Sequence, residues 1–225
     1  MPPKPKFTKE EIAAAALAII REESVEALTA RSLGAKLGTS ARPIFTVFKS
    51  MDEVKWAARA LALREFEAYT GDFTAYTPAF KKIGMQMVSY AIHEPEVFKL
   101  LFMQEHKEGR CFANTIEDLG GMADICISLI RRDYALTPEE AETLFEQMWV
   151  HTFGLGVLCA TRVCDFSEEQ IANMLGQVFA GMLMVLKSGK KDACAIQPQK
   201  DFVGKVGDLP YLRDWCTEKK REEEI

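Results

Sequence analysis

The sequence predicts an all-α protein of about nine helices, arranged as a small three-helix unit followed by a larger helical bundle. Capping-box sequences, in which Ser or Thr precedes Glu or Gln by three positions, occur at residues 8–11, 50–53, 137–140 and 167–170. Apolar residues recur at three- and four-residue steps near both ends of the chain. The sequence contains no alternating strand pattern and no Asn-Gly hairpin signal.

These signals also place the helix boundaries. The expected helices, in chain order, span residues 8–23, 30–37, 41–48, 51–70, 78–92, 95–105, 112–133, 138–162 and 168–188. Thr8 and Thr29 cap the first two helices, and Gly38 ends the second where a left-handed residue is favoured. Ser50 starts the fourth helix, and Pro138 occupies the preferred first position of the eighth.

Three regions follow from this pattern. Residues 1–50 form the three-helix unit and residues 51–190 the bundle, with the helix at 51–70 connecting the two. Residues 191–225 form a C-terminal extension that we expect to be partly ordered, because apolar residues such as Trp215 precede its charged end. A chain of 225 residues with 48% hydrophobic content can bury a sizeable core.

Charge is distributed unevenly along the chain. Residues 1–64 contain 11 Lys and Arg against 7 Asp and Glu, a net charge of +4, so the total of −5 leaves −9 for the other 161 residues. A basic front and an acidic rear fit a protein that meets a polyanion with one end only. The acidic total argues against a protein that coats nucleic acid with its whole surface.

The six cysteines occur at irregular spacings, most of them in apolar segments, which is typical of reduced core residues in a cytoplasmic protein. Cys159 and Cys164 lie near His151, but their spacing matches no metal site, and we expect neither a metal nor a cofactor. Three scattered histidines and the absence of a Gly-rich phosphate loop offer no basis for catalysis. We therefore expect no enzyme.

Two apolar runs imitate targeting segments. Residues 12–20 resemble the core of a signal peptide, but Glu10 and Glu11 precede them and charged residues follow directly. Residues 170–186 carry no charge and approach the length of a membrane span. Gln170, Asn173 and Gln177 form a polar stripe along that helix, so we expect a soluble protein.

The helices at 30–37 and 41–48 are joined by the short turn Gly38-Thr39-Ser40. Two short helices joined in this way form a helix-turn-helix, whose second helix can enter the major groove of DNA. An arginine there can bond both O6 and N7 of guanine, and hydroxyls at helix starts can face phosphates. The candidate DNA-binding residues are Thr29, Arg31, Ser40, Ala41, Arg42, Phe45, Thr46, Lys49 and Lys55. The same spacing also fits the solvated face of an ordinary helical subdomain.

A resemblance favours the DNA-binding interpretation. Residues 12–17 (IAAAAL), 27–34 (ALTARSLG), 37–40 (LGTS) and 44–50 (IFTVFKS) resemble the DNA-binding domain of the TetR family of bacterial transcriptional repressors. Val47 and Met51 stand where that family usually has Tyr and Lys, and Thr46 where it has His or Asn. Arg42 stands near a usual Gly, and Pro43 biases Arg42 away from helical geometry. The family's base-reading pattern therefore does not carry over to this chain.

The rear of the chain resembles the same family more weakly, at residues 93–103 (HEPEVFKLLFM) and 148–154 (MWVHTFG). The resemblance implies a homodimer formed through the last two helices, and an effector pocket in each bundle. The candidate dimer residues are Gly154, Ile171, Leu175, Val178, Met182 and Val185. The spacing of Ile171, Leu175 and Val178 suits packing against another helix, whether of a second copy or of the chain's own core.

Apolar and aromatic residues in the rear helices could line that effector pocket. The candidates are Phe98, Phe102, Met103, Met122, Cys126, Phe145, Met148, Trp149 and His151. Methionine-rich apolar interiors adapt to irregular ligands, although such residues also serve as plain core. The sequence thus predicts a ligand-responsive repressor that binds a palindromic operator as a homodimer and is released by a small apolar or amphipathic effector. The alternative is a helical protein-interaction adaptor with a degenerate helix-turn-helix.

Overall fold

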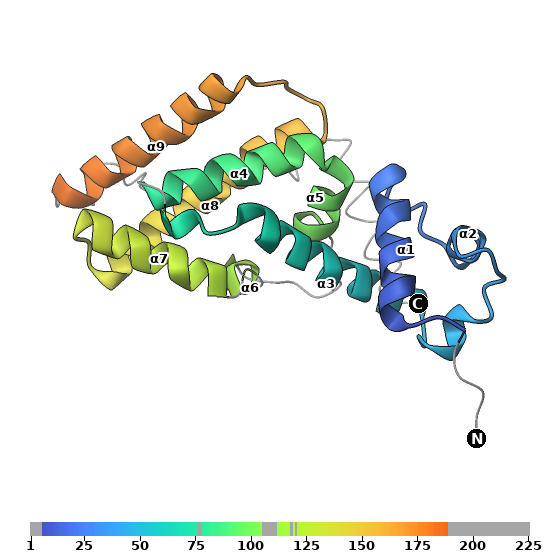
Figure 1. Ribbon diagram of the computed structural model, residues 1–225. Helices are drawn as coiled ribbons and strands as arrows, with labels where there is room; N and C mark the ends of the chain where they lie inside the picture. The colour runs from blue at the N-terminus through green and yellow to red at the C-terminus, as the bar shows by residue number, and fades with distance from the viewer. Residues whose placement is uncertain (1–5, 76–77, 105–111, 118, 120, 189–225) are drawn as a thin grey trace, which may run out of the picture. The chain divides into compact units, whose positions relative to one another are not determined.

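The computed structural model describes residues 6–75, 78–104, 112–117, 119 and 121–188, and every regular element within them is a helix (Figure 1). The predicted all-α fold class is therefore confirmed. The chain divides into two contact units, residues 1–184 and residues 185–225. Of the second unit only residues 185–188 are described, so the predicted extension at 191–225 lies outside the described residues.

The structure contains α-helices close to most of the predicted positions. They are α1 (Lys9–Glu22), α2 (Ala30–Lys36), α3 (Met51–Thr70), α4 (Ala79–His93), α5 (Pro95–Phe102), α6 (Phe112–Glu117), α7 (Gly121–Tyr134), α8 (Pro138–Ala160) and α9 (Glu168–Ser188). Short 3-10 helices, η1 (Ile44–Thr46) and η2 (Phe73–Ala75), flank α3.

The predicted helix caps are present. Thr8 and Thr137 form reciprocal boxes with Glu11 and Glu140, and Ser167 pairs in the same way with Gln170. At Ser50 the box is only half formed, because the Glu53 carboxylate accepts from the backbone N–H of Lys49 instead. Each cap satisfies backbone groups that a helix start leaves free, so the helices begin where local chemistry allows.

Two predicted helices are wrong in form. The helix expected at 41–48 is the single 3-10 turn η1, because Pro43 disfavours helical geometry in the residue before it. The turn is closed by the Val47 N–H, which donates to the Ile44 carbonyl at 3.0 Å. The helix expected at 112–133 is divided into α6 and α7, on either side of residues 118–120. Gly121 is the first residue of α7, and glycine disfavours helix continuation.

The N-terminal helices share one small core. Ile12, Leu17 and Ile20 of α1 are fully buried together with Leu33 of α2 and Ile44 of η1. Helix α1 also packs against α3 and α5, so the same helix contacts both α2 and the bundle (Figure 1). This arrangement connects the N-terminal segment to the bundle through α1 as well as through the chain itself.

The bundle is organised around α4 and α8, which lie side by side (Figure 1). Helix α7 packs on both, and α5 closes one end. Phe98 of α5 is fully buried, and its ring lies against α8 at Gly156, where a Cβ would come within 2.6 Å of a ring atom. The Phe98 ring also pairs with Phe102 and stacks on Phe153. Aromatic side chains therefore hold this end of the bundle together.

Candidate nucleic-acid interface and apolar cavities

The segment that follows α2, residues 40–49, is called here the reading segment. The residue before this segment, Thr39, is bonded to α2: its N–H donates to the Gly34 carbonyl at 2.8 Å. A Cβ on Gly34 would lie 3.0–3.1 Å from backbone atoms of residues 39–41. Gly38 has a φ of +64°, the left-handed geometry predicted for the end of α2. Two glycines thus set the path by which the chain enters the reading segment.

The reading segment has one buried side and one exposed side. Ile44 and Phe48 are buried and anchor it to the N-terminal core. Arg42, Phe45, Thr46 and Lys49 are exposed, as is Ser40, whereas Ala41 is half-buried. Phe45 is 45% exposed, which is high for a phenylalanine. The predicted outer residues are therefore exposed, although only Phe45 and Thr46 among them lie on the 3-10 turn η1.

Several candidate DNA-binding groups already have intramolecular partners. The Thr46 hydroxyl donates to the Pro43 carbonyl at 2.6 Å, which leaves its lone pairs available as acceptors. The Thr29 hydroxyl accepts from the Ser32 N–H at 3.1 Å and so serves the α2 cap. Lys55 is half-buried and lies near Glu26, whose pKa is lowered by hydrogen bonds to its own backbone and to Ser24 and further by Lys55. Arg31 is exposed.

Lys9 was not among the candidate residues, and the structure places it beside the reading segment. Its ammonium lies 5.7 Å from the centre of the Phe48 ring, within reach of a cation–π contact. The first turn of α1 is thereby held against the end of the reading segment. No local pattern in the sequence indicates this, because the contact joins residues 39 positions apart.

A three-way ion pair joins α1 to the bundle. The Arg21 guanidinium contacts Glu65 of α3 at 2.6 Å and Glu94, between α4 and α5, at 2.7 Å. Partial burial disfavours the charged guanidinium, but the hydrogen bonds to Glu94 and Glu65 outweigh burial and raise the pKa of Arg21. All three side chains are partly exposed, so the pair contributes modest stability, on the order of 1 kcal/mol or less. Its value lies in fixing the orientation of α1.

Aromatic rings connect this ion pair to the interior of the bundle. Burial, followed by the charge of Glu94, raises the pKa of Tyr90 to about 12. The Tyr90 ring lies edge-on to Phe66 of α3 at 5.0 Å, and Phe66 lies edge-on to Phe102 of α5 at 5.6 Å. Glu65 and Phe66 are consecutive on α3, so one side chain holds the ion pair and the next faces the bundle interior.

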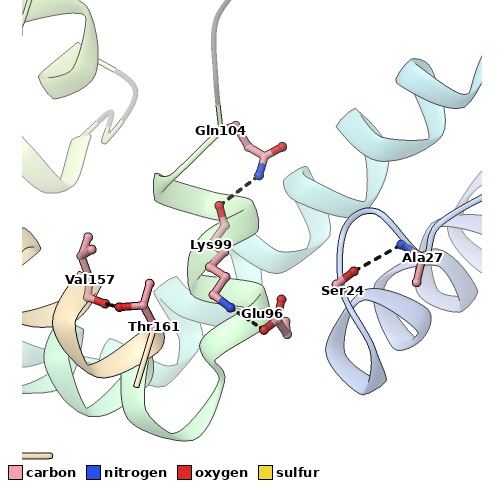
Figure 2. A network of polar contacts seen from close by, with 7 residues as sticks. All are labelled: Ser24, Ala27, Glu96, Lys99, Gln104, Val157 and Thr161. Carbon is pink, nitrogen blue, oxygen red and sulfur yellow. Dashed lines mark hydrogen bonds and ion pairs between the residues drawn. The ribbon is translucent and has the colours of Figure 1, made fainter. Parts of the chain in front are cut away.

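The helix α5 that carries Phe98 and Phe102 is tied at its surface by polar contacts. Figure 2 shows Lys99 paired with Glu96 at 2.6 Å and the Gln104 amide donating to the Lys99 carbonyl at 3.1 Å. The same view shows the Ala27 N–H donating to the Ser24 hydroxyl at 3.3 Å in the loop between α1 and α2. Lys99 contributes to the lowered pKa of Glu26 in that loop, so the two segments are neighbours.

Five of the predicted pocket residues line one partly open cavity, called here the aromatic cavity, whose empty space is about 470 Å³ when the solvent at its mouth is included. These five are Phe102, Met122, Cys126, Phe145 and Trp149. The remaining lining residues were not predicted: Phe66, Phe80, Ile83, Gly84, Met87, Leu119, Ala123 and Thr152. Burial raises the pKa of the Cys126 thiol to about 12, so this side chain acts as an apolar wall at neutral pH.

A second partly open cavity lies between α4, α7, α8 and α9 and is called the α9 cavity; its empty space is about 430 Å³ when the solvent at its mouth is included. Met148 lines it, together with Pro78, Phe80, Lys81, Gly84, Tyr134, Thr152, Leu175, Gly176 and Phe179. The other predicted pocket residues line neither of these two cavities. Phe98 lies behind Phe102, Met103 is half-buried, and His151 has a buried Nε2 without a hydrogen-bond partner among the described residues.

The candidate dimer residues fall on both sides of the last two helices. Ile171 and Leu175 are buried against their own chain, and Val178 and Met182 are half-buried. Gly154 is exposed with open space around it, and Val150 of the same helix is 50% exposed. Met184 of α9 is 73% exposed, and Val185 belongs to the second contact unit. The open apolar surface thus lies opposite the seam that includes Ile171 and Leu175.

Helix α9 is long and apolar enough to cross a membrane by length and composition alone, with 17% of the relevant stretch buried. Among the described residues no group of three His, Cys, Asp or Glu side chains could hold a metal ion.

Comparisons with known proteins agree with the fold. No family model and no curated protein matches the sequence. The structure is similar to the crystal structure of a transcriptional regulator from Rhodococcus sp. Rha1, with a TM-score of 0.54 and 18% sequence identity. The similarity covers 79% of this chain and 97% of the other. It shows that the two proteins share an overall fold.

Proposed function

We propose that this protein is a DNA-binding transcriptional regulator that acts as a homodimeric, effector-released repressor. The observation that carries the proposal is the exposed side of the reading segment. Arg42, Thr46 and Lys49 face solvent there, while Ile44 and Phe48 fix the segment to a core. A cationic and hydroxyl-bearing surface of this size suits the phosphates and base edges of a major groove. The Rhodococcus protein of similar fold is a transcriptional regulator, which agrees with this proposal.

A second copy completes the proposed regulator. One short reading segment offers few contacts, and two copies joined by the bundle would address two half-sites about 34–36 Å apart. The open surface of α8 and α9, around Val150, Gly154 and Met184, is available for that contact. Helix α9 has an apolar composition and is little buried within the single chain, which supports its burial against a second copy of the protein.

The position of α3 supports the proposed release by an effector. A ligand in the aromatic cavity contacts Phe66, and Glu65 beside it holds Arg21 of α1. Movement of Phe66 therefore displaces the helix that supports the reading segment. To shift the protein from 1:99 to 99:1 in favour of the released form, the effector must prefer that form by about 5.5 kcal/mol.

Selection of bound sites from random duplex DNA tests the proposal, first at low and then at moderate salt. The expected result is a palindromic consensus whose affinity falls steeply with salt, because each phosphate contact releases counterions. Light scattering on the same sample measures whether the chain is a dimer. Absence of enrichment from a folded dimer would instead favour the helical adaptor. A sample that requires detergent to stay in solution would indicate a membrane role for α9.

A further inference from the structure

The aromatic cavity and the α9 cavity share part of their walls. Phe80, Gly84 and Thr152 line both. The Phe80 ring lies between them: its centre is 6.1 Å from the ring of Phe145, in the aromatic cavity, and 5.9 Å from the ring of Phe179, in the α9 cavity. One half-buried side chain thus lies in the wall that separates two apolar spaces, both of which open to solvent.

The two cavities differ in one lining residue that bears a charge. Lys81 lines the α9 cavity and is exposed, and the other described lining residues of both cavities are uncharged. A lysine stem can cover an apolar wall while its ammonium remains in water. Lys81 has no ion-pair partner among the described residues. Its ammonium is therefore available to an anionic group at the mouth of the α9 cavity.

We propose that the two cavities form one site for a single-tailed amphipathic anion, such as a fatty-acid-like carboxylate. The head group pairs with Lys81, and the tail crosses the α9 cavity and passes Phe80 into the aromatic cavity. Phe80 determines which tail lengths are accepted, because a tail that fills only the α9 cavity leaves its ring in place. A longer tail must turn the ring aside. This inference rests on the proposed function, since it names the chemical class of the effector.

Displacement of the neutral fluorescent probe N-phenyl-1-naphthylamine from the full-length protein measures the site directly. Saturated carboxylic acids of 8, 10 and 12 carbons compete with the probe, and primary alcohols of the same lengths serve as uncharged counterparts, all below their micelle-forming concentrations. Wild-type protein should prefer each acid over its alcohol by about two- to fivefold, the value of an exposed ion pair. Lys81→Gln should remove that preference and leave alcohol binding unchanged. Arg131→Gln, an exposed charge on α7 outside both cavities, should keep it.

Phe80→Leu and Phe80→Ala test the second part of the proposal. Both variants should strengthen binding of the longest tails by up to about fourfold for each additional buried methylene. Binding of the shortest tail should stay unchanged. Phe153→Leu removes a ring from the same bundle but from neither cavity wall, and should keep the wild-type length dependence. Thermal melts identify variants that fail to fold, and Phe80→Leu decides the result if Phe80→Ala unfolds.

The outcomes separate this inference from the proposed function. Equal displacement by acids and alcohols, or an equal change at all tail lengths in the Phe80 variants, would overturn the inference. Failure of the probe and of every competitor to bind wild-type protein would overturn it as well. Site selection on DNA is independent of all these measurements. A palindromic consensus without acid binding would keep the regulator and reject this ligand class.

Discussion

The reading segment and the two cavities are built in opposite ways. The reading segment is stabilised by backbone contacts over short sequence distances: the Gly38 left-handed turn, the Thr39 to Gly34 hydrogen bond and the 3-10 turn at Ile44. The cavities depend on side chains from α3, α4, α5, α7, α8 and α9. A substitution in the first region changes the course of the chain, whereas one in the second changes the shape of a space.

That difference predicts different failures. A backbone clash in the reading segment cannot be relieved by turning a side chain, so binding of DNA should be lost abruptly. Aromatic side chains around a cavity can turn or shift, so ligand binding should change gradually with the volume added or removed. The predictions below test that distinction, starting with the largest effect.

Gly34→Ala should have the largest effect. The added Cβ would lie 3.0–3.1 Å from backbone atoms of residues 39–41, and the turn must move to accept it. We expect the free energy of unfolding to fall by about 1–3 kcal/mol and specific DNA binding to be lost. Chemical denaturation and fluorescence anisotropy with the selected operator measure the two quantities. Gly121→Ala, with no atom within 4 Å, is the control and should retain operator binding.

The sequence predicted the caps and the turn because their causes are local. Thr8, Thr29 and Thr137 act within three residues, and Gly38 acts on its own backbone. The helix predicted at 41–48 is too long, because Pro43 disfavours helical geometry at Arg42 and only the 3-10 turn η1 forms.

The cavities could be predicted only in part. Cys126, Phe145 and Trp149 were predicted as pocket candidates and line the aromatic cavity, whereas Phe80, which lines both cavities, was not predicted. Nothing next to Phe80 in the sequence indicates that α8 and α9 converge on it. The same holds for Lys9, whose contact with Phe48 depends on how α1 crosses the reading segment.

Arg42→Ala tests base reading directly. Arg42 is exposed on the reading segment and serves no buried contact, so its removal should leave the fold intact. Loss of a bidentate contact to guanine costs about 1–3 kcal/mol of binding free energy, which corresponds to a dissociation constant roughly 5- to 150-fold larger. Arg131→Ala removes the same charge from α7 and should change operator affinity little. Unchanged affinity in Arg42→Ala would remove this residue from the interface.

Stability should fall at alkaline pH because of Cys126. Burial raises the pKa of its thiol from 9.0 to about 12, so the folded state holds a proton that the unfolded state releases. The stability that the protonated thiol contributes is complete below pH 9. As the pH rises from about 9 to 12 the free energy of unfolding falls, by at most about 1.4 kcal/mol per pH unit. Denaturation between pH 8 and 11 should show a shallower slope for Cys126→Val than for wild type. Parallel slopes would place the thiol outside the apolar wall.

Gly84→Ala should produce the smallest change and the clearest separation of stability from binding. Its Cβ would lie 3.5 Å from Leu175 Cδ1 and 3.8 Å from Thr152 Oγ1, which are ordinary contacts. Replacing glycine inside a helix contributes about 1 kcal/mol, so the melting temperature should rise. The methyl group also occupies the wall that the two cavities share, so probe and long-tail binding should weaken. If the melting temperature and the ligand affinity both rise, the ligand does not use this passage. If both fall, the wall cannot accept even one methyl group.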